Sequence, residues 1–169
     1  LSKFTPDGVK EWTKIIDLPD FEFGDGDFFA IDENGEHFYI TGSKYSGPLH
    51  EGGTEAEVIT TVKLDLDENS ESMNVEWTDS VLTENWSQGN AVDVIGYDEN
   101  INSNNNDIYI TGGIGYGYDS NQNIVIDGQT LIGEQDAFIR KIGFNGDVEW
   151  FKIIGTTQQD SSNVIEVSE

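Results

Sequence analysis

The chain has 169 residues, with 33 acidic and 8 basic side chains and a formal net charge of −25 at pH 7. Such a surface repels nucleic acid and anionic membranes, so nucleic-acid binding is excluded as a function. The absence of cysteine removes disulfides, thiolate metal sites and a cysteine nucleophile, and no apolar run reaches the about 18 residues of a membrane-spanning helix.

Three stretches of the chain share an opening pattern of a lysine, a turn and a Glu-Trp pair. The first is Lys3–Ile16 (KFTPDGVKEWTKII), the second lies within Val58–Leu82, and the third is Lys141–Gly155 (KIGFNGDVEWFKIIG). Their tryptophans are 65 and 73 residues apart, which indicates a repeat of about 70 residues. The middle copy has five more residues between lysine and tryptophan, so its hairpin is expected to be longer.

A second phrase, rich in β-branched and aromatic residues, follows the first two openings. HFYITGS (His37–Ser43) returns as DIYITGG (Asp107–Gly113), and a short apolar run precedes each copy. A third apolar run of this kind is NVIEVSE (Asn163–Glu169). Apolar and polar residues alternate within these runs and turn residues separate them, so we expect four short antiparallel strands in each unit.

The sequence therefore predicts an all-β fold built of β-propeller-type blades, about two and a half of them in this chain. The predicted units are 1–57, partial at its start, 58–135, with long loops, and 136–169, incomplete at its end. The chain opens on Leu-Ser-Lys, so we expect a piece of a larger propeller or assembly. Its open strand edges would be covered by further blades of the same parent or by copies of itself.

The third opening, DAFIRKI followed by a turn and DVEW (Asp136–Trp150), resembles the bacterial β-propeller repeat family known as SBBP. The A-V-D-type strand and the I-Y-I-T-G phrase fit the same pattern, and the resemblance extends over nearly the whole chain. It departs in the middle copy, where EVITTVKL replaces DAFIRKI. The resemblance implies a scaffold in a secreted or surface-attached bacterial protein, and it implies no catalytic residues.

The repeated tryptophans Trp12, Trp77 and Trp150 could form a sugar-stacking platform, but their recurrence in phase within strands favours a place in the core between sheets. The residues that we expect to be buried are Phe138, Ile142, Val148, Trp150 and Ile153 in the third unit and Trp12, Ile15, Phe38 and Ile40 in the first. Trp86 is out of phase with the repeat and lies in a polar stretch. It is either a ligand-binding aromatic or a cap on its own loop.

The acidic stretch DLDENSE (65–71) is a candidate calcium site, because Asp65, Asp67, Asn69 and Glu71 place oxygens at alternate positions. Glu76 would stand at the twelfth position of an EF-hand-like loop. Ser70 stands where the sharp turn of such a loop needs glycine, and the flanks are predicted strands. The alternative is a solvated acidic turn, in which Glu76 belongs to the repeat.

We expect a structural or adhesive scaffold module of a secreted or cell-surface protein, located outside the cell and mediating protein–protein or surface assembly. The first alternative is a calcium- or glycan-binding module, with calcium as the cofactor or surface polysaccharide as the partner. The second is a propeller-based hydrolase or lyase. Neither His37 nor His50 has a repeated partner and no nucleophile elbow or HExxH pattern occurs, so we do not expect an enzyme.

Overall fold

The computed structural model describes residues 1–16, 18, 28–32, 35–48, 55–66, 72–81, 86–95, 107–116 and 125–168, and every regular element in them is a β-strand. In chain order the strands are β1 (Ser2–Phe4), β2 (Lys10–Thr13), β3 (Phe28–Ile31), β4 (His37–Pro48), β5 (Glu55–Asp65), β6 (Asn74–Val81), β7 (Trp86–Ile95), β8 (Asp107–Tyr116), β9 (Val125–Ile126), β10 (Gln129–Thr130), β11 (Asp136–Ile142) and β12 (Val148–Ile154). In this part of the chain no helix has the length and apolar character of a membrane span.

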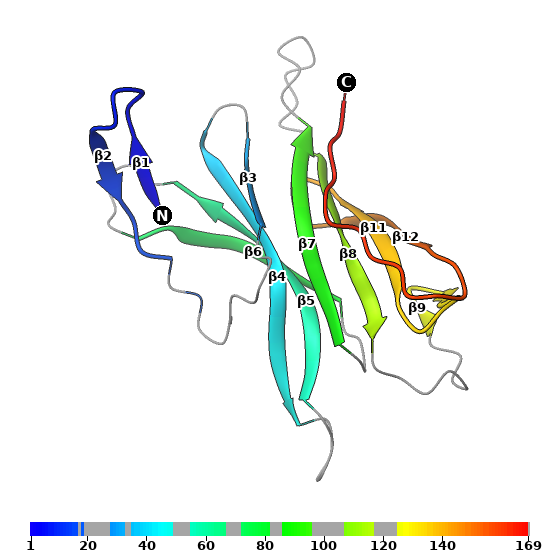
Figure 1. Cartoon of the computed structure of the whole chain (residues 1–169). Coiled ribbons are helices and arrows are strands. Elements are labelled where there is room, and N and C mark those ends of the chain that lie inside the picture. Colours follow the sequence, from blue (N-terminus) through cyan, green and yellow to red (C-terminus); the bar gives the residue numbers. More distant parts are fainter. Residues whose placement is uncertain are drawn as a thin grey trace.

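The strands form two antiparallel sheets of four strands each, as expected for an all-β fold (Figure 1). The first sheet has the order β3-β4-β5-β6 and the second has the order β7-β8-β11-β12, while β1-β2 and β9-β10 form separate pairs. Each sheet combines the apolar run and the I-T-G phrase of one sequence unit with the opening hairpin of the next. The expected boundary between residues 57 and 58 therefore falls within β5, inside the first sheet.

The hairpins form because their sequences combine period-two alternation with turns that need glycine. In β11 the residues Asp136, Phe138, Arg140 and Ile142 are buried and those between them are half-buried. The turn to β12 is closed by Gly143 N–H donating to the Asp147 carbonyl oxygen at 2.9 Å. Gly8 and Gly146 occupy the same place in the first and last hairpins, with φ of 80° and 88°, a region that side chains disfavour.

The two sheets pack through one core, because β7 lies against the face of the first sheet formed by β4 and β5 (Figure 1). This core holds buried side chains from both sheets, and among them are Tyr39 and Ile59 from the first and Val92, Ile108 and Phe138 from the second. A second cluster lies on the first sheet around Phe38, Ile40, Val62, Leu64 and Met73, with Trp12 packed against it. The first sheet is thus covered on both faces.

The core predictions are confirmed at Phe38, Ile40, Phe138 and Ile142, all of which are buried. Trp12, Trp77, Trp150 and Ile153 are half-buried. The prediction is wrong for Val148, which is 41% exposed, and for Ile15, which is 69% exposed. Val148 is the first residue of β12 and pairs with Ile142, separated by a register shift from the pair of Lys141 and Trp150. Ile15 lies beyond β2 in an isolated bridge to Ser72.

The predicted strand at Asn163–Glu169 is not formed, since residues 163–168 carry no strand and Glu169 is outside the described part. This segment lies against β7. The side-chain Nδ2 of Asn90 donates to the carbonyl oxygen of Ser162 at 3.0 Å, and Val167 N–H donates to Asp93 Oδ2 at 2.7 Å. Side-chain groups of β7 thus hold the backbone at Ser162, just before this segment, and at Val167 within it, in place of a strand ladder.

Glycine in the I-T-G phrase makes room for close backbone approach. A Cβ on Gly112 would collide with the Gln88 carbonyl oxygen and would lie 2.9 Å from the Phe138 ring. Gly112→Ala is therefore expected to lower the free energy of unfolding by about 1–3 kcal/mol, as overpacking does. Denaturant titration checks this, with Gly143→Ala as the control, because the nearest atoms to a Cβ there are 3.6 Å away. Equal losses in the two variants would contradict the steric explanation.

Candidate functional site

The turn between β11 and β12 covers the tryptophan of the preceding unit. The indole Nε1 of Trp77 donates to the carbonyl oxygen of Phe144 at 3.0 Å, across 67 residues of sequence. A Cβ on Gly146 would lie only 3.1 Å from the Trp77 ring, so glycine permits the close approach of this turn. The opening hairpin of one unit thus docks on the Glu-Trp strand of the unit before it.

The Phe144 ring extends this contact over two polar side chains of the first sheet. It meets the ring of His37 edge-on, with the centroids 5.3 Å apart. The ammonium Nζ of Lys63 lies 3.1 Å from the Phe144 centroid, and the Lys63 side chain is only 1% exposed. This buried ammonium is neutralised by Glu76, whose Oε2 is 2.7 Å from Nζ.

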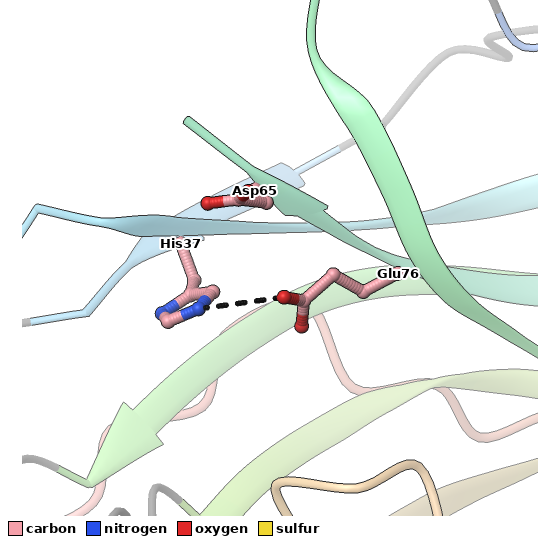
Figure 2. Close-up of side chains that lie close together, drawn as sticks. All are labelled: His37, Asp65 and Glu76. Atoms are coloured by element: carbon pink, nitrogen blue, oxygen red, sulfur yellow. Dashed lines mark ion pairs between the residues drawn. The ribbon is translucent and has the colours of Figure 1, made fainter. Parts of the chain in front are cut away.

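His37, Asp65 and Glu76 lie together at one end of the first sheet (Figure 2). Each offers a nitrogen or oxygen ligand atom, and these atoms all lie within 4.8 Å of one another. His37 begins β4 and pairs with Asp65 at the end of β5, while Glu76 lies on β6. Three neighbouring strands therefore fix the three side chains.

The ring of His37 is oriented by Asp32, whose side chain is 2% exposed. His37 Nδ1 lies 2.7 Å from Asp32 Oδ2, and Asp32 Oδ1 accepts the backbone N–H of Glu36 at 2.9 Å. A carboxylate is an acceptor, so Nδ1 carries the proton that it donates. This arrangement leaves Nε2 directed at Glu76, 3.8 Å from Oε1 (Figure 2).

An ion pair between lysine and glutamate recurs in all three units. Lys3 and Glu11 are 3.0 Å apart, as are Lys63 and Glu76 at 2.7 Å and Lys141 and Glu149 at 2.6 Å. Lys141 also contacts Asp107 at 2.8 Å. Its hydrogen bonds, the one to Asp107 having the larger effect and the one to Glu149 the next, raise the pKa of this ammonium well above its ordinary range. The glutamate of each Glu-Trp pair therefore belongs to the repeat.

Of the predicted calcium ligands, Asp65 belongs to this cluster, whereas Asp67, Asn69 and Glu71 lie outside the described residues. Trp86 was expected in a polar loop, but it is the first residue of β7 and pairs with Tyr116; its side chain lies outside the described part. Sequence reasoning did not place His37 in a site. The sequence offers one signal for it: His37 is the first residue of the phrase HFYITGS, and the second copy, DIYITGG, begins with Asp107 instead.

Trp150 holds the position in the last unit that Trp77 holds in the one before. Its ring neighbours belong to its own sheet: Tyr109 lies edge-on with centroids 6.0 Å apart, and Lys152 Nζ lies 5.3 Å from the ring. Trp150 thus has the same residue type and the same strand position as Trp77, on which the Phe144 turn docks.

No known family model matches the chain, and no curated protein is found to be similar to it.

Proposed function

We propose that this chain is a structural scaffold module whose repeats dock on one another and mediate protein–protein assembly. The observation that carries this proposal is the hydrogen bond from Trp77 to the Phe144 carbonyl, which joins the second and third units. A contact made by repeated residues can be made again wherever those residues recur. We take the two sheets as consecutive blades of a β-propeller of SBBP type, in a secreted or cell-surface protein.

The first hairpin has the features of the docking turn. Thr5 N–H donates to the Val9 carbonyl at 2.8 Å and Gly8 N–H to the Thr5 carbonyl at 2.9 Å. Residues Gly143, Gly146 and Asp147 make the same two bonds in the last hairpin, both at 2.9 Å. When the two hairpins are aligned by these bonds, the Pro6 carbonyl occupies the position of the Phe144 carbonyl, which accepts the hydrogen bond from the Trp77 indole. The partner of Trp150 is then the Thr5–Val9 turn of a second copy, added head to tail.

The net charge of −25 opposes this association at low ionic strength, since copies of one sign repel each other. At physiological salt the chain is expected to self-associate with rising concentration, which light scattering and sedimentation velocity measure. Trp150→Ser should shift the association to at least about tenfold higher concentration, because the ring and its N–H donor are removed. Its control is Ile132→Ser, which removes an apolar side chain that is 54% exposed elsewhere.

A stable monomer at all concentrations would overturn the assembly proposal. Equal weakening by Trp150→Ser and Ile132→Ser would overturn the docking of the turn on Trp150 and would indicate general surface hydrophobicity instead. The assembly proposal would survive that second result, so the two outcomes separate the function from its geometry.

A further inference from the structure

We propose that His37, Asp65 and Glu76 bind a divalent transition-metal ion, with zinc as the closest chemical match. An imidazole nitrogen and two carboxylate oxygens are ligands that zinc accepts in proteins, and water can complete a four-coordinate site. Calcium and magnesium prefer oxygen ligands alone, so the histidine argues against them. The three ligand atoms are already within 4.8 Å of one another, and modest side-chain rotation closes the set around an ion.

The contact between His37 and Asp32 supports a metal ion between these side chains. His37 Nδ1 lies 2.7 Å from Asp32 Oδ2, so in the neutral ring Nδ1 carries the proton and Nε2 has the lone pair that binds a metal ion. Nε2 and Glu76 Oε1 face each other 3.8 Å apart. A carboxylate on the far nitrogen of a metal-bound histidine is the usual arrangement at zinc sites, because it fixes the tautomer and orients the ring.

The second sheet offers an internal comparison for this cluster. At the equivalent positions it has Asp107 in place of His37 and Gly143 in place of Asp65. There the Lys141 ammonium lies between two carboxylates, 2.8 Å from Asp107 and 2.6 Å from Glu149. The second sheet therefore forms without a histidine at the position of His37 and without an aspartate at the position of Asp65. Two of the three proposed ligands are thus residues that the repeated fold does not require.

Charge also leaves a place for a divalent ion. Three carboxylates, those of Asp32, Asp65 and Glu76, lie around the imidazole, and the Lys63 ammonium contacts Glu76. Lys63 Nζ binds Oε2, while the oxygen facing His37 is Oε1. Glu76 can therefore bind the metal through one oxygen and keep its ion pair through the other. The lysine weakens the site relative to one with free carboxylates.

The site is tested by calorimetric titration of the chelator-treated protein with zinc. In a second experiment, the absorption spectrum of added Co²⁺ reports whether the ligands are nitrogen and oxygen atoms. One ion per chain is expected. His37→Gln should weaken binding at least about tenfold, because glutamine can still bond Asp32 but is a poor ligand. Asp65→Asn should weaken binding as well. The matched controls are His50→Gln, at the other histidine of the chain, and Asp107→Asn, at the equivalent position of the second sheet.

Unchanged zinc affinity in both His37→Gln and Asp65→Asn would overturn the proposal, as would a loss confined to His50→Gln. Magnesium at the same concentration separates specific binding from screening of the acidic surface. If magnesium raises the melting temperature as zinc does, equally in the parent and in His37→Gln, the effect is screening and the site is rejected. Self-association does not enter this test, so the metal site and the scaffold function can fail independently.

Discussion

Replacing Phe138 with alanine is expected to lower the free energy of unfolding by about 3–5 kcal/mol, as the loss of a buried aromatic side chain and the resulting cavity do in other cores. Phe138 is fully buried and stacks on Phe151 with ring centroids 5.7 Å apart. It also belongs to the core cluster that both sheets share. The cavity would open where the sheets meet, and β11 and its neighbour β8 are each paired on both sides and cannot collapse into it.

Denaturant titration followed by tryptophan fluorescence measures this loss. Val125→Ala is the control, since this side chain is 58% exposed and its truncation should change stability by no more than about 0.5 kcal/mol. If Phe138→Ala unfolded at the same denaturant concentration as the parent, the shared core would not stabilise the fold. A transition that split into two steps would show that the sheets unfold separately.

The hairpins could be predicted from the sequence because their determinants are local. Three local signals lie within about 15 residues of each other. They are the spacing of Lys141 and Trp150, the positive φ of Gly146 and the alternation of β11. The same signals predicted the first hairpin. Sheet membership depends instead on which strands meet after long connections close, and nothing within a unit specifies that β4 pairs with β5 of the next unit.

The faces of the strands were only partly predictable. Alternation predicts two faces, and it does not say which of them a neighbouring sheet covers. Phe138 and Ile142 were predicted correctly because they are in phase with the DAFIRKI pattern. Val148 is equally apolar, but it is the first residue of β12, and a register shift separates its pair with Ile142 from the pair of Lys141 with Trp150. The sequence has no clear signal of this bulge.

The cluster around His37 could not be predicted by reading along the chain. An EF-hand-like pattern uses oxygens at fixed steps within one loop, and this interpretation joined Asp65 to residues that follow it in sequence. In the structure Asp65 is joined to His37 and Glu76 by strand pairing, across 28 residues on one side and 11 on the other. Only the paired register of β4, β5 and β6 brings the three together.

The ion pair between Arg140 and Asp79 is the second place where a large effect is expected. Arg140 lies on β11 of the second sheet with 7% of its side chain exposed, and its Nη2 is 2.9 Å from Asp79 Oδ1 on β6 of the first sheet. Asp127 lies farther away, with Oδ2 3.6 Å from Nη1. In the described residues the buried Nε of Arg140 has no acceptor. The desolvation of this guanidinium is therefore incompletely compensated.

Asp79→Leu is expected to lower the free energy of unfolding by about 3 kcal/mol, because it leaves a buried guanidinium without its close partner. Arg140→Met should cost less, since Asp79 is 16% exposed and can be neutralised by protonation. The double variant Asp79→Leu with Arg140→Met should recover most of the loss, as apolar replacements of buried ion pairs do. Losses that simply added in the double variant would contradict the coupling of the two charges.

The pH dependence of stability provides the last test of this pair. Burial raises the pKa of the Asp79 carboxyl above its ordinary value, against the opposing effects of Arg140. A raised pKa in the folded state means that the folded chain holds this proton more tightly than the unfolded chain. The contribution of Asp79 to stability is therefore complete below the pKa of the unfolded chain and is lost as pH rises through the folded pKa. Relative to Asp79→Asn, the parent should lose stability over that window, and parallel profiles of the two proteins would show that Asp79 titrates as in the unfolded chain.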